Sequence, residues 1–164
     1  MKDDKYYMSL AIKEAKKACL IDEVPVGAVI VHNDKVIARA HNTREKTNDP
    51  TAHAEVNAIR KACKKLSSWR LVGCTIYITV EPCSMCAGTI LWSRIDRVVY
   101  GAKDIKGGAL GSSYNLFQQK GINHIPTIEG GILAEECGII IKDYFKSKRT
   151  KQWKTVILNS SLSH

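Results

Sequence analysis

No apolar run in this 164-residue sequence approaches the length of about 20 residues that a membrane-spanning helix requires. The first ten residues, MKDDKYYMSL, also lack the basic start and the continuous apolar stretch of a signal peptide. The chain has no internal repeat, no low-complexity segment and no linker that would divide it. These absences argue against membrane-spanning, secreted and fibrous proteins, and we expect one cytoplasmic domain over residues 1–164.

Acidic residues are outnumbered by basic ones. Asp and Glu number 16 against 25 Lys and Arg, which gives a formal net charge of +9. Such a surplus favours an anionic partner, nucleic acid being the commonest, although it can also serve solubility alone. The bases are concentrated in KDYFKSKRTKQWK, residues 142–154, where Tyr144, Phe145 and Trp153 are interleaved with them. Lysine and arginine can contact phosphates while aromatic rings stack on unpaired bases, but a solvated helix face would have the same charge pattern.

The spacing of apolar residues predicts helices and strands in alternation. The expected elements are a helix over residues 3–20, a hairpin in VPVGAVIVHNDKVIARAHN, a helix over 49–66, a strand over 74–80, a helix in CSMCAGTILW, a strand over 96–102, an edge strand in IPTIEG, a basic closing helix over about 131–150 and a tail over 151–164. This order predicts an α/β fold with three layers, α/β/α, around a mixed, mostly parallel five-stranded sheet. In open sheets of this kind, sites gather where strand ends meet helix starts.

The six cysteines have no secretory context that would pair them in disulfides. Four of them lie in apolar or helical surroundings and are expected to be small buried side chains: Cys19, Cys63, Cys74 and Cys137. The other two need a separate explanation.

Cys83 and Cys86 stand three residues apart in TVEPCSMCAG, at the start of a predicted helix. This spacing puts both on one face of a helical turn, close enough to share a metal ion. The unpaired N–H groups and the positive dipole at a helix start also favour thiolate over thiol. A structural cross-link and a thioredoxin-like redox pair are the alternative interpretations of Cys-x-x-Cys, so a metal site requires a further ligand.

His53 can supply that ligand, because DPTAHAEVNAI lies at another junction where a helix begins. Zinc binds imidazole and thiolate readily; three protein ligands are typical of a catalytic site, and four of a structural one. No fourth ligand is evident, since His32 and His41 fall in or beside the hairpin and His124 in a late loop. Zinc lowers the pKa of bound water to roughly 7, and Glu55 is the candidate base for its proton. Residues two apart on a regular helix point to opposite sides, so His53 must lie at an irregular helix start for the two to act together.

HAE together with EPCSMC resembles the signature of the zinc-dependent cytidine/adenosine deaminase superfamily. Three longer segments, DPTAHAEVNAIRKA, EPCSMCAGTILWSRIDRVVYGAKDIKGGALGS and EGGILAEECGIIIKDYFKSKR, are similar to bacterial tRNA-specific adenosine deaminases over nearly the whole chain. The resemblance implies a cytidine deaminase-like fold, one Zn²⁺ per chain and deamination of the wobble adenosine in the anticodon loop of an arginine tRNA. It also implies a homodimer with an RNA site built partly across the subunit interface.

Matched residue by residue, the resemblance makes His53, Cys83 and Cys86 the zinc ligands and Glu55 the proton shuttle. The sequence departs from the family pattern at Trp92, where relatives carry smaller or polar residues, and in the tail, which matches no motif. These departures concern the outer RNA contacts and leave the chemistry unchanged.

Four more residues match positions that contact the substrate in the family. The resemblance places Asn42 against the flipped nucleotide and gives Ala54 a backbone donor in the base pocket. It places Asp104 beside a neighbouring ribose and Phe145 near the RNA. Without the resemblance, Asn42 and Asp104 would be interpreted as turn residues and Phe145 as a core residue.

Two other functions stay open at this point. A free-base or nucleoside deaminase acting on guanine or cytosine would share the zinc signature, but the basic, aromatic closing helix and the loop GAKDIKGGALGS favour RNA. A non-catalytic RNA-binding module with structural zinc would need a fourth protein ligand and would leave Glu55 without a role.

Overall fold

The computed structural model of the chain describes residues 1–161, and its side chains as far as residue 151. The helices are α1 (Asp4–Leu20), α2 (Arg44–Thr47), α3 (Ala54–Leu66), α4 (Ser84–Ser93) and α5 (Ala134–Ser161), with one turn of 3-10 helix, η1 (Leu116–Gln118). The strands are β1 (Gly27–His32), β2 (Lys35–His41), β3 (Cys74–Val80), β4 (Arg97–Ala102) and β5 (Thr127–Glu129). Within the described residues, no helix is long and apolar enough to cross a membrane.

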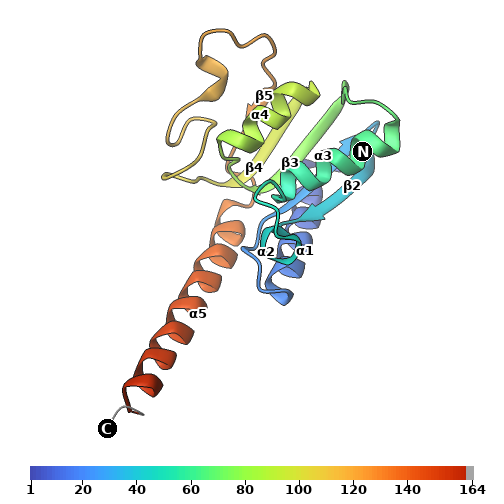
Figure 1. Ribbon diagram of the computed structural model, residues 1–164. Helices are drawn as coiled ribbons and strands as arrows, with labels where there is room; N and C mark the ends of the chain where they lie inside the picture. Colours follow the sequence, from blue (N-terminus) through green and yellow to red (C-terminus); the bar gives the residue numbers. More distant parts are fainter. Residues whose placement is uncertain (162–164) are drawn as a thin grey trace.

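The strands form one mixed sheet in the order β2-β1-β3-β4-β5 (Figure 1). β1 is antiparallel to both of its neighbours, whereas β3, β4 and β5 are parallel to one another. Four of these strands therefore run in one direction and β1 runs in the other. β3, α4 and β4 form a crossover connection between parallel neighbours. The prediction of an α/β fold with a mixed, mostly parallel five-stranded sheet is confirmed.

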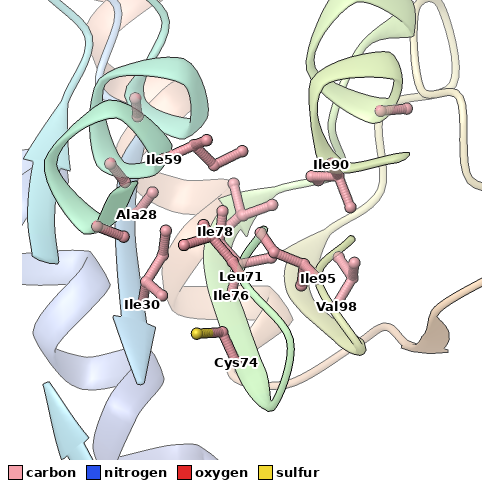
Figure 2. Close-up of a cluster of buried hydrophobic side chains, with 14 of the residues drawn as sticks. Ala28, Ile30, Ile59, Leu71, Cys74, Ile76, Ile78, Ile90, Ile95 and Val98 are labelled. Carbon is pink, nitrogen blue, oxygen red and sulfur yellow. The ribbon is translucent and has the colours of Figure 1, made fainter. Parts of the chain in front are cut away.

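Helices cover both faces of the sheet and complete three layers. α1 and the first turns of α5 pack on one face, and α3 and α4 pack on the other (Figure 1). Side chains alternate accordingly along each strand: in β3, Ile76 and Ile78 face α3 and α4, while Tyr77 faces α1. Figure 2 shows the cluster on the α3–α4 face, to which Ile59 of α3 and Ile90 of α4 contribute. This shared core holds the two helices side by side on the sheet.

The helix predicted over residues 49–66 starts five residues late, at Ala54. The cause is a separate turn, in which the Asp49 carboxylate accepts hydrogen bonds from the backbone N–H and the hydroxyl of Thr51. Asp49 and the proline after it were predicted to begin this helix, but they form a turn that precedes it.

The closing helix also differs from its predicted range. α5 begins at Ala134 instead of residue 131 and continues to Ser161, because no glycine or proline interrupts it after Gly138. Of the predicted tail over 151–164, residues 162–164 lie outside the described residues. The assignment of the whole chain to one domain with a tail stays a prediction.

One of the four cysteines expected in the interior is not there. Cys74 and Cys137 are buried and Cys63 is half-buried, but Cys19 is exposed. The buried face of α1 includes Ala15 and Ala18, so that Cys19 falls at the margin of that face in the last turn of the helix. The buried position in this turn of the helix is Ala18, one residue before Cys19.

An ion pair ties the start of α1 to the sheet and gives the fold a measurable pH dependence. The Asp4 carboxylate accepts hydrogen bonds from two nitrogens of Arg97, each at 2.7 Å, and from the Tyr77 hydroxyl at 2.7 Å. The Arg97 guanidinium holds the pKa of Asp4 below its ordinary value. A carboxyl group whose pKa is lowered by folding adds stability above its unfolded pKa and loses it as the pH falls through the folded pKa.

Asp4→Asn should therefore lower the free energy of unfolding by about 2 kcal/mol at pH 7, the usual range for hydrogen bonds to a charged group. The difference from the parent protein should shrink once the pH falls below about 3.9, the pKa of an unfolded Asp. Urea unfolding of both proteins at pH 7 and at a series of lower pH values measures this. An equal difference at every pH would show that the carboxylate charge contributes nothing.

Candidate active site

His53 stands immediately before α3, in extended backbone with φ −72° and ψ 156°. Its side chain therefore leaves the chain in a direction that a helical residue could not use. Glu55 is the second residue of α3 and is buried. The irregular helix start that the His-x-Glu spacing requires is present, so the two side chains can serve the same site although they are two residues apart.

Cys83 and Cys86 are placed by the junction between β3 and α4. Cys83 is the residue before α4, with φ −74° and ψ 177°, and Cys86 lies in the first turn of the helix, fully buried. Because α3 and α4 lie on the same face of the sheet, their starts bring the two thiols to His53. The Nδ1 atom of His53 lies 3.7 Å from the Cys83 sulfur and 3.5 Å from the Cys86 sulfur.

These donors fit zinc in both chemistry and spacing. The three ligand atoms lie within 4.8 Å of one another, and no other group of three such donors is found among the described residues. Zinc–sulfur bonds of about 2.3 Å and zinc–nitrogen bonds of about 2.0 Å in a tetrahedron separate nitrogen from sulfur by about 3.5 Å. His53 Nδ1, Cys83 Sγ and Cys86 Sγ therefore match three corners of a zinc site.

The two thiols share one proton unequally. The hydrogen bond from Cys86, together with that from His53, lowers the pKa of Cys83 to about 4, although burial of the thiol acts in the opposite direction and raises it. The pKa of Cys86 is raised, because the same hydrogen bond to Cys83 and the burial of the thiol hold the proton on Cys86. Zinc requires both sulfurs as thiolates, so metal binding must release this proton.

Burial raises the pKa of Glu55 to about 7. A hydrogen bond between its carboxyl group and Cys86 opposes that shift and places the group beside the metal donors. A general acid or base works best when its pKa lies near the working pH, because the group then both accepts and donates a proton readily. Glu55 meets this condition at neutral pH.

A cavity of about 120 Å³ opens beside these residues and is lined by Val24, Val26, Asn42, Arg44, His53, Ala54 and Glu55. Asn42 follows β2 and is buried; its Nδ2 donates to the Val24 carbonyl at 3.3 Å and its Oδ1 accepts from the Arg44 N–H at 3.1 Å. Ala54 is the first residue of α3, so its backbone N–H has no acceptor within the helix. The structure thus brings Asn42 and Ala54 together with Glu55.

A family model of the cytidine and deoxycytidylate deaminase zinc-binding region matches residues 1–102. The tRNA-specific adenosine deaminase of Bacillus subtilis is 50% identical to this chain over 152 residues, which cover 93% of this chain and 94% of that protein. A solved structure of a tRNA:A34 deaminase, from a study of A-to-I editing at the wobble position of transfer RNA, is 44% identical, with a TM-score of 0.79 and coverage of 82% of this chain and 98% of that one. The chain belongs to the tRNA-specific adenosine deaminases.

A guanine deaminase of Bacillus subtilis is a more distant structural neighbour of this deaminase. It is 34% identical, with a TM-score of 0.60, and the match covers 73% of this chain and 87% of that one. Membership of the zinc-binding family and the fit of the three donors make zinc the cofactor of the deaminase. The prediction of a zinc enzyme of this family is confirmed.

The two remaining candidates for substrate contact lie outside the cavity lining. Asp104 follows β4, and its Oδ1 accepts hydrogen bonds from the N–H groups of Lys106 and Gly107, each at 3.1 Å. Asp104 therefore closes a turn in the loop after β4. Phe145 lies on α5 with 42% of its surface exposed, its ring edge-on to Tyr144. The interpretation of Phe145 as a core residue is wrong, and its contact with RNA stays a prediction.

A groove of about 1050 Å³ runs from the cavity to α5. Its lining residues are Ile21, Asp22, Glu23, Val24, Arg44, Glu45, Lys46, Tyr144, Phe145, Lys148, Arg149 and Lys151. Val24 and Arg44 line both the groove and the cavity, so the two hollows meet. Lys148 pairs with Asp22 at 2.9 Å, and this bond ties α5 to the loop before β1. Trp153, also expected near the RNA, lies outside the residues with described side chains.

Sequence reasoning missed two polar residues that support the site. Asn57 of α3 donates from Nδ2 to the His41 carbonyl and to the Thr43 hydroxyl, each at 3.0 Å, and so holds the segment that carries Asn42. Glu81, between β3 and Cys83, is buried although it is acidic. The acidic residue directly before Pro-Cys in EPCSMC was the available signal, because an acid at the end of an apolar strand needs partners.

Proposed function

We propose that the protein catalyses the hydrolytic deamination of adenosine to inosine at the wobble position of a tRNA anticodon, with an arginine tRNA as substrate. The observation that carries the proposal is the meeting of three zinc donors with a buried carboxyl group at a small cavity, which a basic groove extends. Three protein donors leave a tetrahedral metal open on one side, as hydrolysis requires.

The protein's own residues supply the binding and the proton transfers. His53, Cys83 and Cys86 would hold the zinc ion, which would supply a water molecule with a pKa near neutrality. Glu55 takes one proton from that water on its buried carboxylate and passes it to the adenine ring nitrogen. It then carries a second proton, from the oxygen now bonded to C6, to the amino group, which leaves as ammonia. The Ala54 N–H orients the base in the cavity. An adenine inside a base stack cannot enter, so the nucleotide must be presented unpaired from a loop.

The rest of the anticodon loop is expected in the groove. Arg44, Lys46 and Arg149 line it and can contact phosphates, while the exposed ring of Phe145 offers a stacking surface. Asn42 contacts the flipped nucleotide, and Asp104 faces a neighbouring ribose. The roles of Asn42, Ala54, Asp104 and Phe145 follow the family resemblance and are part of the proposal.

A homodimer and a cytoplasmic location complete the proposed function. Trp92 on α4 leaves 68% of its surface exposed, and a second copy of the chain would cover such a ring. Sedimentation velocity of the zinc-loaded protein tests this: we expect a species of twice the chain mass, which Trp92→Glu converts to the monomer. The free thiols of the chain suit a reducing compartment, where tRNA is processed.

Ammonia release from a panel of substrates tests the function itself. We expect turnover of an arginine-tRNA anticodon stem-loop RNA and none of free guanine, cytosine or adenosine, because the groove has no role in binding a single base. The alternative is a free-base deaminase with the same zinc site, and its support is the structural likeness to a guanine deaminase. Turnover of guanine or cytosine with none of RNA would establish that alternative.

A single charge removed from the groove should weaken RNA binding without slowing the chemistry. Arg149 is exposed and lies at the groove, outside the cavity. Arg149→Ala should raise the KM for the stem-loop roughly fivefold, leave kcat unchanged and reduce the salt dependence of binding by about one counterion. Lys64→Ala, which removes an equally exposed charge at the far end of α3, is the matched control. Equal effects of the two substitutions would exclude the groove as the RNA path.

A further inference from the structure

A buried carboxylate with no assigned role stands two residues before Cys83. Glu81 is buried, with 2% of its surface exposed. Its carboxyl group accepts four hydrogen bonds, all from the loop after β4. Its Oε1 accepts from the Asp104 N–H at 3.4 Å and from the Ser112 hydroxyl. Its Oε2 accepts from the N–H groups of Leu110 at 3.1 Å and Ser112 at 3.2 Å. No cationic side chain pairs with Glu81 in the part of the chain that the structure describes.

The loop fits closely around this carboxylate. A Cβ atom on Gly108 would overlap Oε2 of Glu81 and the carbonyl oxygen of Asp104, so only glycine allows the approach. The next residue, Ala109, donates its N–H to the Pro82 carbonyl at 2.9 Å. The loop is therefore bonded to both residues that connect β3 to the zinc ligand Cys83.

We propose that Glu81 is a positioning residue that fixes the loop Asp104–Ser112 against the turn carrying Cys83, in the orientation that receives the RNA. The proposal rests on the proposed function for its RNA part. The physical reason is that, within the described residues, the buried carboxyl oxygens of Glu81 accept hydrogen bonds only from donors of this loop. Moving the loop away would leave a buried carboxylate without partners, which is strongly unfavourable.

The fixed loop presents the groups expected to meet RNA. Asp104 donates its backbone N–H to Glu81 and closes its own turn with its side chain, so the turn and the carboxylate are locked to each other. Lys103 and Lys106 are exposed on either side of Asp104, and Ile105 leaves 78% of its surface exposed. His53 is held by the start of α3, and Cys83 and Cys86 by the start of α4. Loss of the loop contact should therefore weaken RNA binding and leave zinc binding unchanged.

Hydrogen–deuterium exchange of the zinc-loaded protein tests the contact without reference to activity. Glu81→Ala should speed exchange of the Leu110 and Ser112 amides at least about tenfold. Glu81→Gln should stay close to the parent protein at these two amides, because its amide oxygen can accept from the Leu110 and Ser112 N–H groups while its nitrogen donates to the Ser112 hydroxyl. The only bond it loses is the long one from the Asp104 N–H, at 3.4 Å. Gly108→Ala keeps the carboxylate and displaces the loop, and it should reproduce the fast exchange even if Glu81→Ala fails to fold.

Steady-state kinetics on the anticodon stem-loop test the consequence. Glu81→Ala and Gly108→Ala should raise KM about tenfold, with kcat nearly unchanged and one zinc per chain, whereas Glu81→Gln should behave as the parent. Glu129→Ala, which removes a half-exposed carboxylate of β5, is the control and should change neither quantity.

Each outcome decides the proposal. Unchanged amide exchange in both loop-releasing variants would overturn the positioning role, and fast exchange with an unchanged KM would overturn its link to RNA. If the parent protein does not turn over RNA at all, the proposed function fails, and the exchange data still decide whether Glu81 holds the loop.

Discussion

Glu55→Gln should abolish turnover and leave zinc in place. Glutamine has the shape of glutamate but cannot hold and release the proton that the reaction must move. Loss of a general acid and base typically lowers the rate 10²–10⁴-fold, and here one group serves at two steps, so we expect a decrease of about 10⁴-fold in kcat. The zinc donors are untouched, so metal analysis should still find one zinc per chain.

The comparison of kcat with zinc content makes this test specific. Burial raises the pKa of Glu55 to about 7, so its neutral form already exists in the folded protein and the amide should be accommodated. Binding of the stem-loop RNA to the variant should remain near the parent value. Retention of more than about a tenth of the activity would assign the proton transfers to another group.

Cys86→Ser should remove both the metal and the activity. Cys86 is fully buried at the start of α4, and its sulfur lies 3.5 Å from His53 Nδ1. A serine hydroxyl is a poor ligand for zinc and does not ionise near neutral pH, so two donors would remain where a catalytic site keeps three. We expect no zinc after dialysis, activity at background, and a melting temperature that no longer rises with added zinc.

Cys63→Ser is the control, because Cys63 is half-buried on α3 and takes no part in the metal cluster. It should keep one zinc per chain, full activity and a zinc-dependent melting temperature. A Cys86→Ser protein that still binds one zinc tightly would mean that another donor completes the site, as in a structural zinc module.

The sequence predicted that His53, Cys83 and Cys86 lie together, because each of them stands at a strand-to-helix or turn-to-helix junction, where local signals are strong. The sequence could not place the start of α3, since Asp49 and the proline after it are equally suited to begin a helix or a turn, and a contact with Thr51 decided between them. That single boundary determines whether His53 and Glu55 can face one site.

Glu81 shows a different limit of sequence reasoning. Its partners lie 23 to 31 residues further along the chain and are mostly backbone N–H groups, which carry no side-chain signature. The groove was invisible for the same reason, because it depends on the direction in which α5 leaves the sheet beside the loop before β1. Burial of Cys19 failed as a prediction because periodicity identifies a helix face more reliably than it locates the end of that face.

Because β1 runs against the other four strands, the segment before β1 lies at the same end of the sheet as the residues that follow β2, β3 and β4. Gly27 at the start of β1 pairs with His41 at the end of β2. Val26 and Asn42 therefore lie at the C-terminal ends of β2, β3 and β4, together with the residues that follow β3 and β4. In an all-parallel sheet, the segment before β1 would lie at the opposite ends of these strands. The hairpin turn at Asn33 and Asp34 lies at those opposite ends, far from the groups that the reaction uses. A purification tag or a fused protein inserted at this turn should leave the enzyme's substrate access unobstructed.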